Sequence, residues 1–118
     1  MNKNHPDPAE KSRAAAIRQL NDAFRQSLTG GVVLMTAGII ALGVEQQAKI
    51  LAAVRSFDTF TEDNDPWGEH DFGSLTVSGE HIFFKLDYYD PTRARHSNDP
   101  ADPAVTERVL TIMLASEY

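Results

Sequence analysis

The sequence predicts an α+β fold, in which a small, mostly antiparallel sheet of about four strands packs against two helices. Two segments, residues 8–28 and 44–56, repeat apolar side chains at helical spacing. Residues 72–88 alternate between apolar and polar side chains on either side of Ser78-Gly79, which is typical of a β-hairpin. We therefore expect the two helices and a central hairpin to share one hydrophobic core.

The first helix is expected to begin at Asp7-Pro8, because aspartate caps helix N-termini and proline suits the first helical position. Thr29-Gly30-Gly31 is expected to end it. Its apolar stripe consists of Ile17, Leu20, Phe24 and Leu28. Three arginines lie off this stripe, namely Arg13, Arg18 and Arg25. Residues 1–7 are expected to be disordered, and residues 8–118 to form a single domain.

The hairpin turn fixes the pairing of its two strands. Pairing Val77 with Glu80 places Leu75 opposite Ile82, and every second residue then shares a face. The expected core face contains Leu75, Val77, Ile82, Phe84 and Leu86. The other face contains Ser74, Thr76, His81, Phe83 and Lys85.

Two further strands are expected outside the hairpin. Residues 32–36 are a short apolar run between glycine-containing breaks, which predicts a strand buried on both faces and therefore central in the sheet. Residues 105–116 fit either a strand or a helix, and the β-branched residues favour a strand. Residues 89–103 contain three Asp-Pro pairs and predict a loop.

Composition excludes several classes of function. The chain contains no cysteine, which excludes disulfides, thiolate catalysis and zinc sites built on sulfur. Its net charge of −6 argues against direct binding of nucleic acid, which requires lysine and arginine. The apolar stretch 30–43 is too short and too rich in glycine to span a membrane, so we expect a cytoplasmic protein.

Negative charge is concentrated in the middle of the chain, because residues 56–84 contain no lysine or arginine. This distribution predicts a surface that binds a basic protein partner. Its residues are Asp58, Glu62, Asp63, Asp65, Trp67, Glu69 and Asp71. The alternative is a structural loop, in which residues 63–65 fold back on backbone amides and Trp67 pins the loop to the core.

A metal site is not expected in this loop. Asp63, Asp65 and Gly68 match positions one, three and six of a calcium-binding EF-hand loop, but Trp67 and Ser74 stand at positions five and twelve, where ligands are required. We therefore expect neither a metal nor a cofactor.

An acid-base or metal-dependent enzyme centred on Glu69, His70 and Asp71 remains an alternative, with His81 or Asp87 joining from the hairpin. Strand geometry counts against a self-contained triad, because adjacent residues point to opposite faces. A related candidate polar site consists of His70, His81, Lys85, Asp87 and Tyr89.

The chain also resembles an uncharacterised bacterial family, a domain of unknown function carried on plasmids, phages and other mobile elements. The resemblance covers about residues 18–118 and rests on DNDPWGEHDFG, KLDYYD and RVLTIMLASEY. It implies no activity. It does imply a context in which small proteins serve replication, transfer or the suppression of host defence.

These observations favour a non-enzymatic accessory protein that binds a host protein with a basic surface. The expected target is a nucleic-acid-handling defence complex, so that the protein would be an inhibitor of anti-CRISPR or antirestriction type. A structural or self-associating module, such as a homodimer, is a further alternative.

Overall fold

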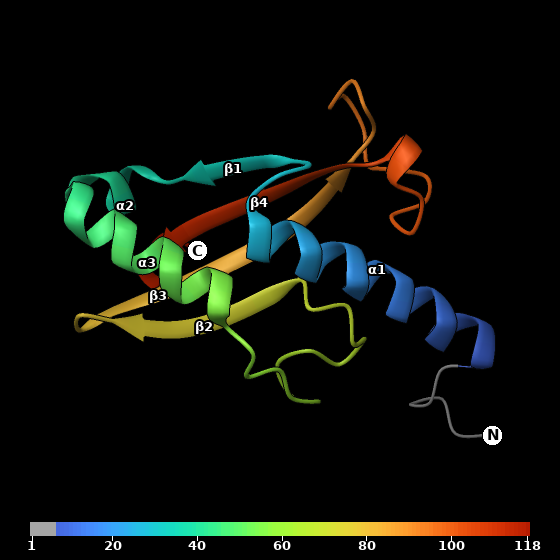
Figure 1. The fold of residues 1–118 in the computed structure, drawn as a ribbon, viewed down its shortest axis with the longest axis horizontal. Coiled ribbons are helices and arrows are strands. Elements are labelled where there is room, and N and C mark those ends of the chain that lie inside the picture. Colours follow the sequence, from blue (N-terminus) through green and yellow to red (C-terminus); the bar gives the residue numbers. More distant parts are fainter. Residues whose placement is uncertain (1–6) are drawn as a thin grey trace.

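The computed structural model describes residues 7–118. The expected disorder of residues 1–7 therefore concerns residues outside the described part, with the exception of Asp7. Figure 1 shows the arrangement of the chain. The helices are α1 (Pro8–Ser27), α2 (Ala37–Ala41) and α3 (Val44–Ser56), with two short 3-10 helices, η1 (Pro103–Val105) and η2 (Ala115–Glu117). The strands are β1 (Val32–Met35), β2 (Phe72–Val77), β3 (Glu80–Tyr89) and β4 (Glu107–Leu114).

The four strands form one mixed sheet in the order β1-β4-β3-β2. Strand β1 runs parallel to β4, and the other two pairs are antiparallel. The predicted α+β class, the mostly antiparallel sheet and the two long helices are therefore confirmed. No helix in the described part of the chain is both long and apolar enough to cross a membrane.

Helix α1 begins as its sequence predicts. The Asp7 side chain accepts a hydrogen bond from the Glu10 backbone N–H at 2.8 Å, and Pro8 occupies the first turn. The helix ends where Leu28 adopts a left-handed conformation with φ of 58°. Ile17 and Phe24 of the apolar stripe are buried against the rest of the protein.

The hairpin has the predicted register, with Leu75 opposite Ile82 and Gly73 opposite Phe84. Ser78 and Gly79 both have positive φ, 51° and 81°, as a tight two-residue hairpin turn requires. Gly73 is needed for packing, because a Cβ there would lie 2.1 Å from the Phe84 ring.

Strand β4 settles the ambiguity of residues 105–116 in favour of a strand. It lies between β1 and β3 and is the most buried strand, with Leu110 and Ile112 fully inaccessible to solvent. Burial on both sides explains why its apolar run lacks the alternation of a half-exposed strand.

One sequence prediction about the segment around β1 is wrong, and one helix there was not predicted. Strand β1 is an edge strand rather than a central one, and its Leu34 is 49% exposed. Strand β1 has a neighbouring strand, β4, along only one of its two edges, although its sequence is apolar throughout. Helix α2 was not predicted, since Gly38 suggested a break, yet α2 buries Ile39 completely in the core.

All three helices contribute to one core on the same face of the sheet, which we call the inner face. Phe24, Ile39 and Val54 of the helices join Phe84 and Ile112 of the sheet in this core. The opposite face, which we call the outer face, is defined by Val32, Leu34, Phe72, Ser74, Thr76, His81, Phe83, Lys85, Asp87, Tyr89, Glu107, Val109, Thr111 and Met113.

Candidate functional site

The acidic loop, residues 57–71, connects α3 to β2 and is held by its own side chains. The Asn64 side-chain oxygen accepts a hydrogen bond from the Thr61 N–H at 2.8 Å. The Asp65 carboxylate accepts hydrogen bonds from the backbone N–H groups of Glu69 and His70 at 3.1 and 3.2 Å. Asn64 and Asp65 therefore fold back on backbone amides, which gives the loop a defined shape.

His70 ties this loop to helix α1. Its Nδ1 lies 2.9 Å from an Asp22 carboxylate oxygen, and its Nε2 lies 3.6 Å from Asp65 on the opposite side. The imidazole stacks on the Phe60 ring with a centroid distance of 3.8 Å. His70 itself has a positive φ of 56°, which turns its side chain toward the helix and away from the strand that follows.

A buried polar cluster lies beneath the loop, between α1 and the strands. Asn21 is its centre and is fully inaccessible to solvent. Its side-chain NH₂ donates to the Glu69 carbonyl oxygen at 2.9 Å and to the Tyr88 hydroxyl oxygen at 2.8 Å. Its side-chain oxygen accepts from Arg108 Nε at 2.8 Å. The Tyr88 hydroxyl in turn donates to the Glu69 carboxylate at 3.2 Å.

Burial determines the electrostatics of this cluster. It raises the pKa of the Glu69 carboxyl, and the nearby Asp71 carboxylate raises that pKa further. Burial also raises the pKa of the Asp71 carboxyl and of the Tyr88 hydroxyl. The Arg108 guanidinium has its pKa lowered by burial, and it lies 5.3 Å from the centre of the Tyr88 ring.

A second buried arginine, Arg25, joins α1 to the end of α3. Its guanidinium donates to the Val54 and Arg55 carbonyl oxygens at 2.8 and 3.1 Å, and to Asp22 at 3.0 Å. Because the last carbonyl groups of a helix lack helical partners, the positive guanidinium suits this position. Asp22 therefore links the Arg25 contact to His70 and the acidic loop.

The structure divides the predicted binding surface into exposed and buried residues. Asp58, Glu62 and Asp63 are exposed, while Glu69 and Asp71 are half-buried. Asp65 is only 8% exposed, because its carboxylate is turned inward to the loop amides, so it does not belong to the surface. Trp67 is 72% exposed, so the prediction that it pins the loop to the core is wrong.

The predicted polar site is not brought together. His70 contacts α1 on the inner side of the sheet, whereas His81, Lys85, Asp87 and Tyr89 lie on the outer face. His81 is hydrogen-bonded to Ser74 at 2.7 Å, so it does not join Glu69 and Asp71 either. Within residues 7–118, no group of three or more histidine or acidic side chains is placed to hold a metal ion.

Sequence reasoning missed the residues at the centre of the polar cluster. Asn21 follows the buried Ile17 by four residues and Arg25 follows Asn21 by four, so both occupy the buried side of α1. That spacing is visible in the sequence, but the apolar stripe alone does not include Arg25, which is nevertheless buried, and it gives no reason to place the polar Asn21 in the interior. Arg108 could not have been assigned, because its partner Asn21 lies 87 residues away in the chain.

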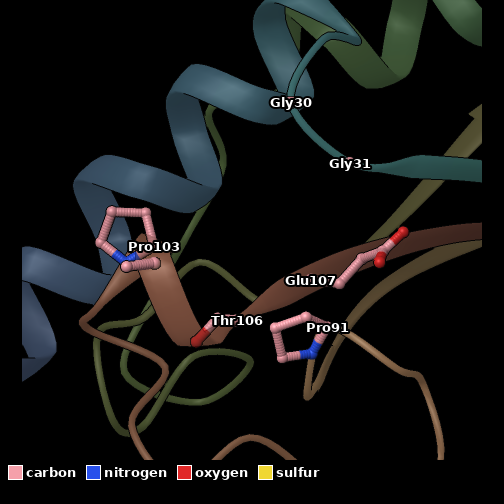
Figure 2. Close-up of a pocket in the computed structure, with 7 residues that line it drawn as sticks. Gly30, Gly31, Pro91, Pro103, Thr106 and Glu107 are labelled. Atoms are coloured by element: carbon pink, nitrogen blue, oxygen red, sulfur yellow. The ribbon is translucent and has the colours of Figure 1, made fainter.

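Two hollows in the surface lie away from this cluster. Figure 2 shows the first, of about 320 Å³, which is lined by Gly30 and Gly31 before β1 and by residues near η1, including Pro103 and Glu107. The second, of about 350 Å³, lies on the outer face. None of the cluster residues Asn21, Glu69, Tyr88 and Arg108 lines either hollow, so neither would bring a substrate to them.

Comparison with known protein families gives one result. Residues 35–117 match the model of a family described as "Protein of unknown function (DUF3768)". The chain belongs to the DUF3768 family. The match begins at the end of β1, so the α1 residues of the DUF3768 protein that complete the polar cluster lie outside the matched region. No curated protein and no solved structure matches the chain.

Proposed function

We propose that this DUF3768 protein acts by binding another protein through the acidic loop, with Trp67 as the apolar anchor of the contact. The observation that supports this proposal is the exposure of Trp67, which is 72% accessible in a loop whose other exposed side chains, Pro66 apart, are charged or polar. Tryptophan is enriched at protein interfaces and among the residues that dominate binding energies.

The shape of the loop supports the same function. Trp67 stands between Asp65, which is bonded to loop amides, and Gly68, whose carbonyl oxygen accepts a hydrogen bond from Arg18 at 2.9 Å. His70 then fixes the end of the loop to α1. A loop held at both sides of its anchor loses little conformational freedom on binding, which favours affinity.

The negative charge around Trp67 indicates which kind of surface the partner should present. Asp58, Glu62 and Asp63 are exposed on the same loop, and residues 56–84 contain no basic residue. Such a surface attracts a positively charged one and accelerates the encounter at low salt. The partner should therefore present a basic surface with an apolar pocket for the indole ring.

Complexes that handle nucleic acids present basic grooves of this kind. We extend the proposal to an accessory protein of a mobile element that inhibits a host defence complex of the CRISPR or restriction type. This extension depends on charge and on the sequence resemblance to proteins of mobile elements.

The first experiment compares proteins captured from bacterial lysate by the wild type, by Trp67→Ala and by Val44→Ala. Val44 is 82% exposed on α3, so its variant controls for the loss of an exposed apolar side chain elsewhere. The partner should be retained by Val44→Ala, lost with Trp67→Ala, and bound more weakly as salt rises. Equal capture by both variants would contradict the role of the loop.

The second experiment tests the extension. Cells with an active restriction or CRISPR system are challenged with phage while they express the wild type or Trp67→Ala. We expect more plaques with the wild type than with the variant. If the partner is captured but plaque numbers do not change, the loop binds a protein outside defence.

The enzymatic alternative rests on the raised pKa values of the Glu69 and Asp71 carboxyls. Both shifts are explained by burial beneath the loop, and Glu69 is already engaged with Tyr88. The geometry therefore supports a structural role for these carboxyls more strongly than a chemical one.

A further inference from the structure

The outer face of the sheet carries apolar side chains that no helix of the described chain covers. The register places Leu34 of β1 and Phe83 of β3 on this face, where Leu34 is 49% exposed and Phe83 is half-buried. Val109 and Met113 of β4 lie between them and are already buried within the single chain. Val32, Leu34 and Val109 line part of its hollow of about 350 Å³. A sheet with an apolar face normally buries that face against a second layer. The inner face has such a layer, formed by the helices, and the outer face lacks one.

The charges of the outer face cancel one another. Lys85 Nζ lies 3.1 Å from an Asp87 carboxylate oxygen, and Arg93 Nε lies 3.6 Å from a Glu107 carboxylate oxygen. Two positive and two negative side chains leave this face neutral, although the chain as a whole carries −6. Because two copies of an acidic protein repel each other elsewhere, a neutral apolar face is where they can meet at little electrostatic cost.

The accessible surface of the chain is also large for its mass. A compact monomer of 13.0 kDa is expected to expose about 6300 Å². This chain exposes 7323 Å². The excess, about 1000 Å², is of the size that one partner contributes to a standard protein interface, about 800 Å². The exposed first turns of α1 contribute to the exposed surface of the chain, and so do Leu34 and the half-buried Val32 and Phe83 of the outer face.

We infer that the outer face binds a second copy of this chain, and that the two sheets pack face to face in a twofold-symmetric dimer. The same surface would then serve both subunits, with the exposed Leu34 near the centre of the buried area. The acidic loop contacts α1 on the inner side of the sheet, so a dimer leaves both copies of Trp67 accessible. The inference therefore does not depend on the proposed function of the loop.

The test measures the mass of the full chain in solution by light scattering across a dilution series. The wild type should change between 13.0 kDa and twice that mass with concentration. Leu34→Glu introduces a charge at a half-exposed site on the outer face and should weaken dimerisation by about tenfold or more. Val44→Glu places the same charge on exposed α3, outside this face, and should dimerise as the wild type does.

A second variant tests the charge argument without removing an apolar contact. Lys85→Glu replaces the Lys85–Asp87 ion pair with two negative charges, so each copy would present a face of charge −2. Dimerisation should weaken by about tenfold at low salt and recover in part as salt screens the repulsion. Circular dichroism checks that each variant is folded.

A wild type that stays monomeric at every concentration would overturn the inference, and the outer face would then be open to a different protein. A dimer that neither Leu34→Glu nor Lys85→Glu weakens would overturn the inference as well. So would a dimer that the control variant Val44→Glu weakens as much as Leu34→Glu does.

Discussion

Replacing Asn21 with alanine tests whether the polar cluster holds the fold together. The side chain makes three hydrogen bonds, two donated from its NH₂ group and one accepted from the Arg108 guanidinium. A neutral hydrogen bond contributes about 1 kcal/mol and one to a charged group about 1.5–3 kcal/mol, with a further cost when a buried partner is left unsatisfied. We expect Asn21→Ala to lower the free energy of unfolding by about 3 kcal/mol or more.

Such a loss is large for a domain of this size, whose total stability is of the order of 5–15 kcal/mol. Urea denaturation followed by far-ultraviolet circular dichroism measures it. Tryptophan fluorescence suits this measurement poorly, because Trp67 is already 72% exposed in the folded state. Gln19→Ala is the matched control, since Gln19 is an exposed amide on the same helix and its loss should change stability by less than about 0.5 kcal/mol.

A difference of less than about 1 kcal/mol between Asn21→Ala and Gln19→Ala would refute this reasoning, because it would mean that water replaces the lost partners. Both variants should be measured at a concentration where the wild type is monomeric, so that self-association does not contribute to the apparent stability.

Three further predictions follow from the packing and the electrostatics. Gly73→Ala should destabilise the protein by about 2 kcal/mol or more, because the added Cβ would collide with the buried Phe84 ring. Thr76→Ala, on the exposed side of the same strand, is the control and should change the stability little. Urea denaturation measures both variants. Asp71→Asn should stabilise the fold at pH 7. Because burial raises the pKa of the Asp71 carboxyl, the folded protein binds the proton more tightly than the unfolded chain, so the wild type loses stability as pH rises through the folded pKa. The advantage of the variant should therefore shrink as pH falls from 7 toward the ordinary aspartate pKa of about 3.9, and an advantage that stays constant over that range would argue against a buried charge. Adding zinc, manganese or calcium should leave the melting temperature unchanged, because the described residues gather no metal-binding group, and a rise that grows with metal concentration would contradict this.

Local sequence rules predicted the elements whose structure depends on nearby residues. The α1 cap depends on Asp7 and Pro8, and the hairpin register depends on the two-residue turn at Ser78-Gly79, so both were predictable. The place of β1 in the sheet was not. An apolar run shows that a strand packs against something, but it does not show whether a neighbour lies on one side or on both.

The candidate site shows the same limit. The concentration of negative charge in residues 57–71 is visible in the sequence, and the residue types there suggested turns that the structure contains. It could not show that Trp67 points outward, because an aromatic residue in a loop serves equally well as a core anchor or a binding residue. The contacts that decide the matter, such as His70 with Asp22, join segments 48 residues apart.

The parallel pairing of β1 with β4 has a consequence for the synthesis of the protein. Val32 pairs with Val109, so β1 cannot join the sheet until β4 has left the ribosome. Local pairs such as β2 and β3 can form earlier, because closing a short loop costs less entropy than closing a long one. During translation the apolar residues of β1 therefore remain unpaired until β4 has been synthesised. Slow translation of β4 would prolong the period in which the nascent chain is prone to aggregate.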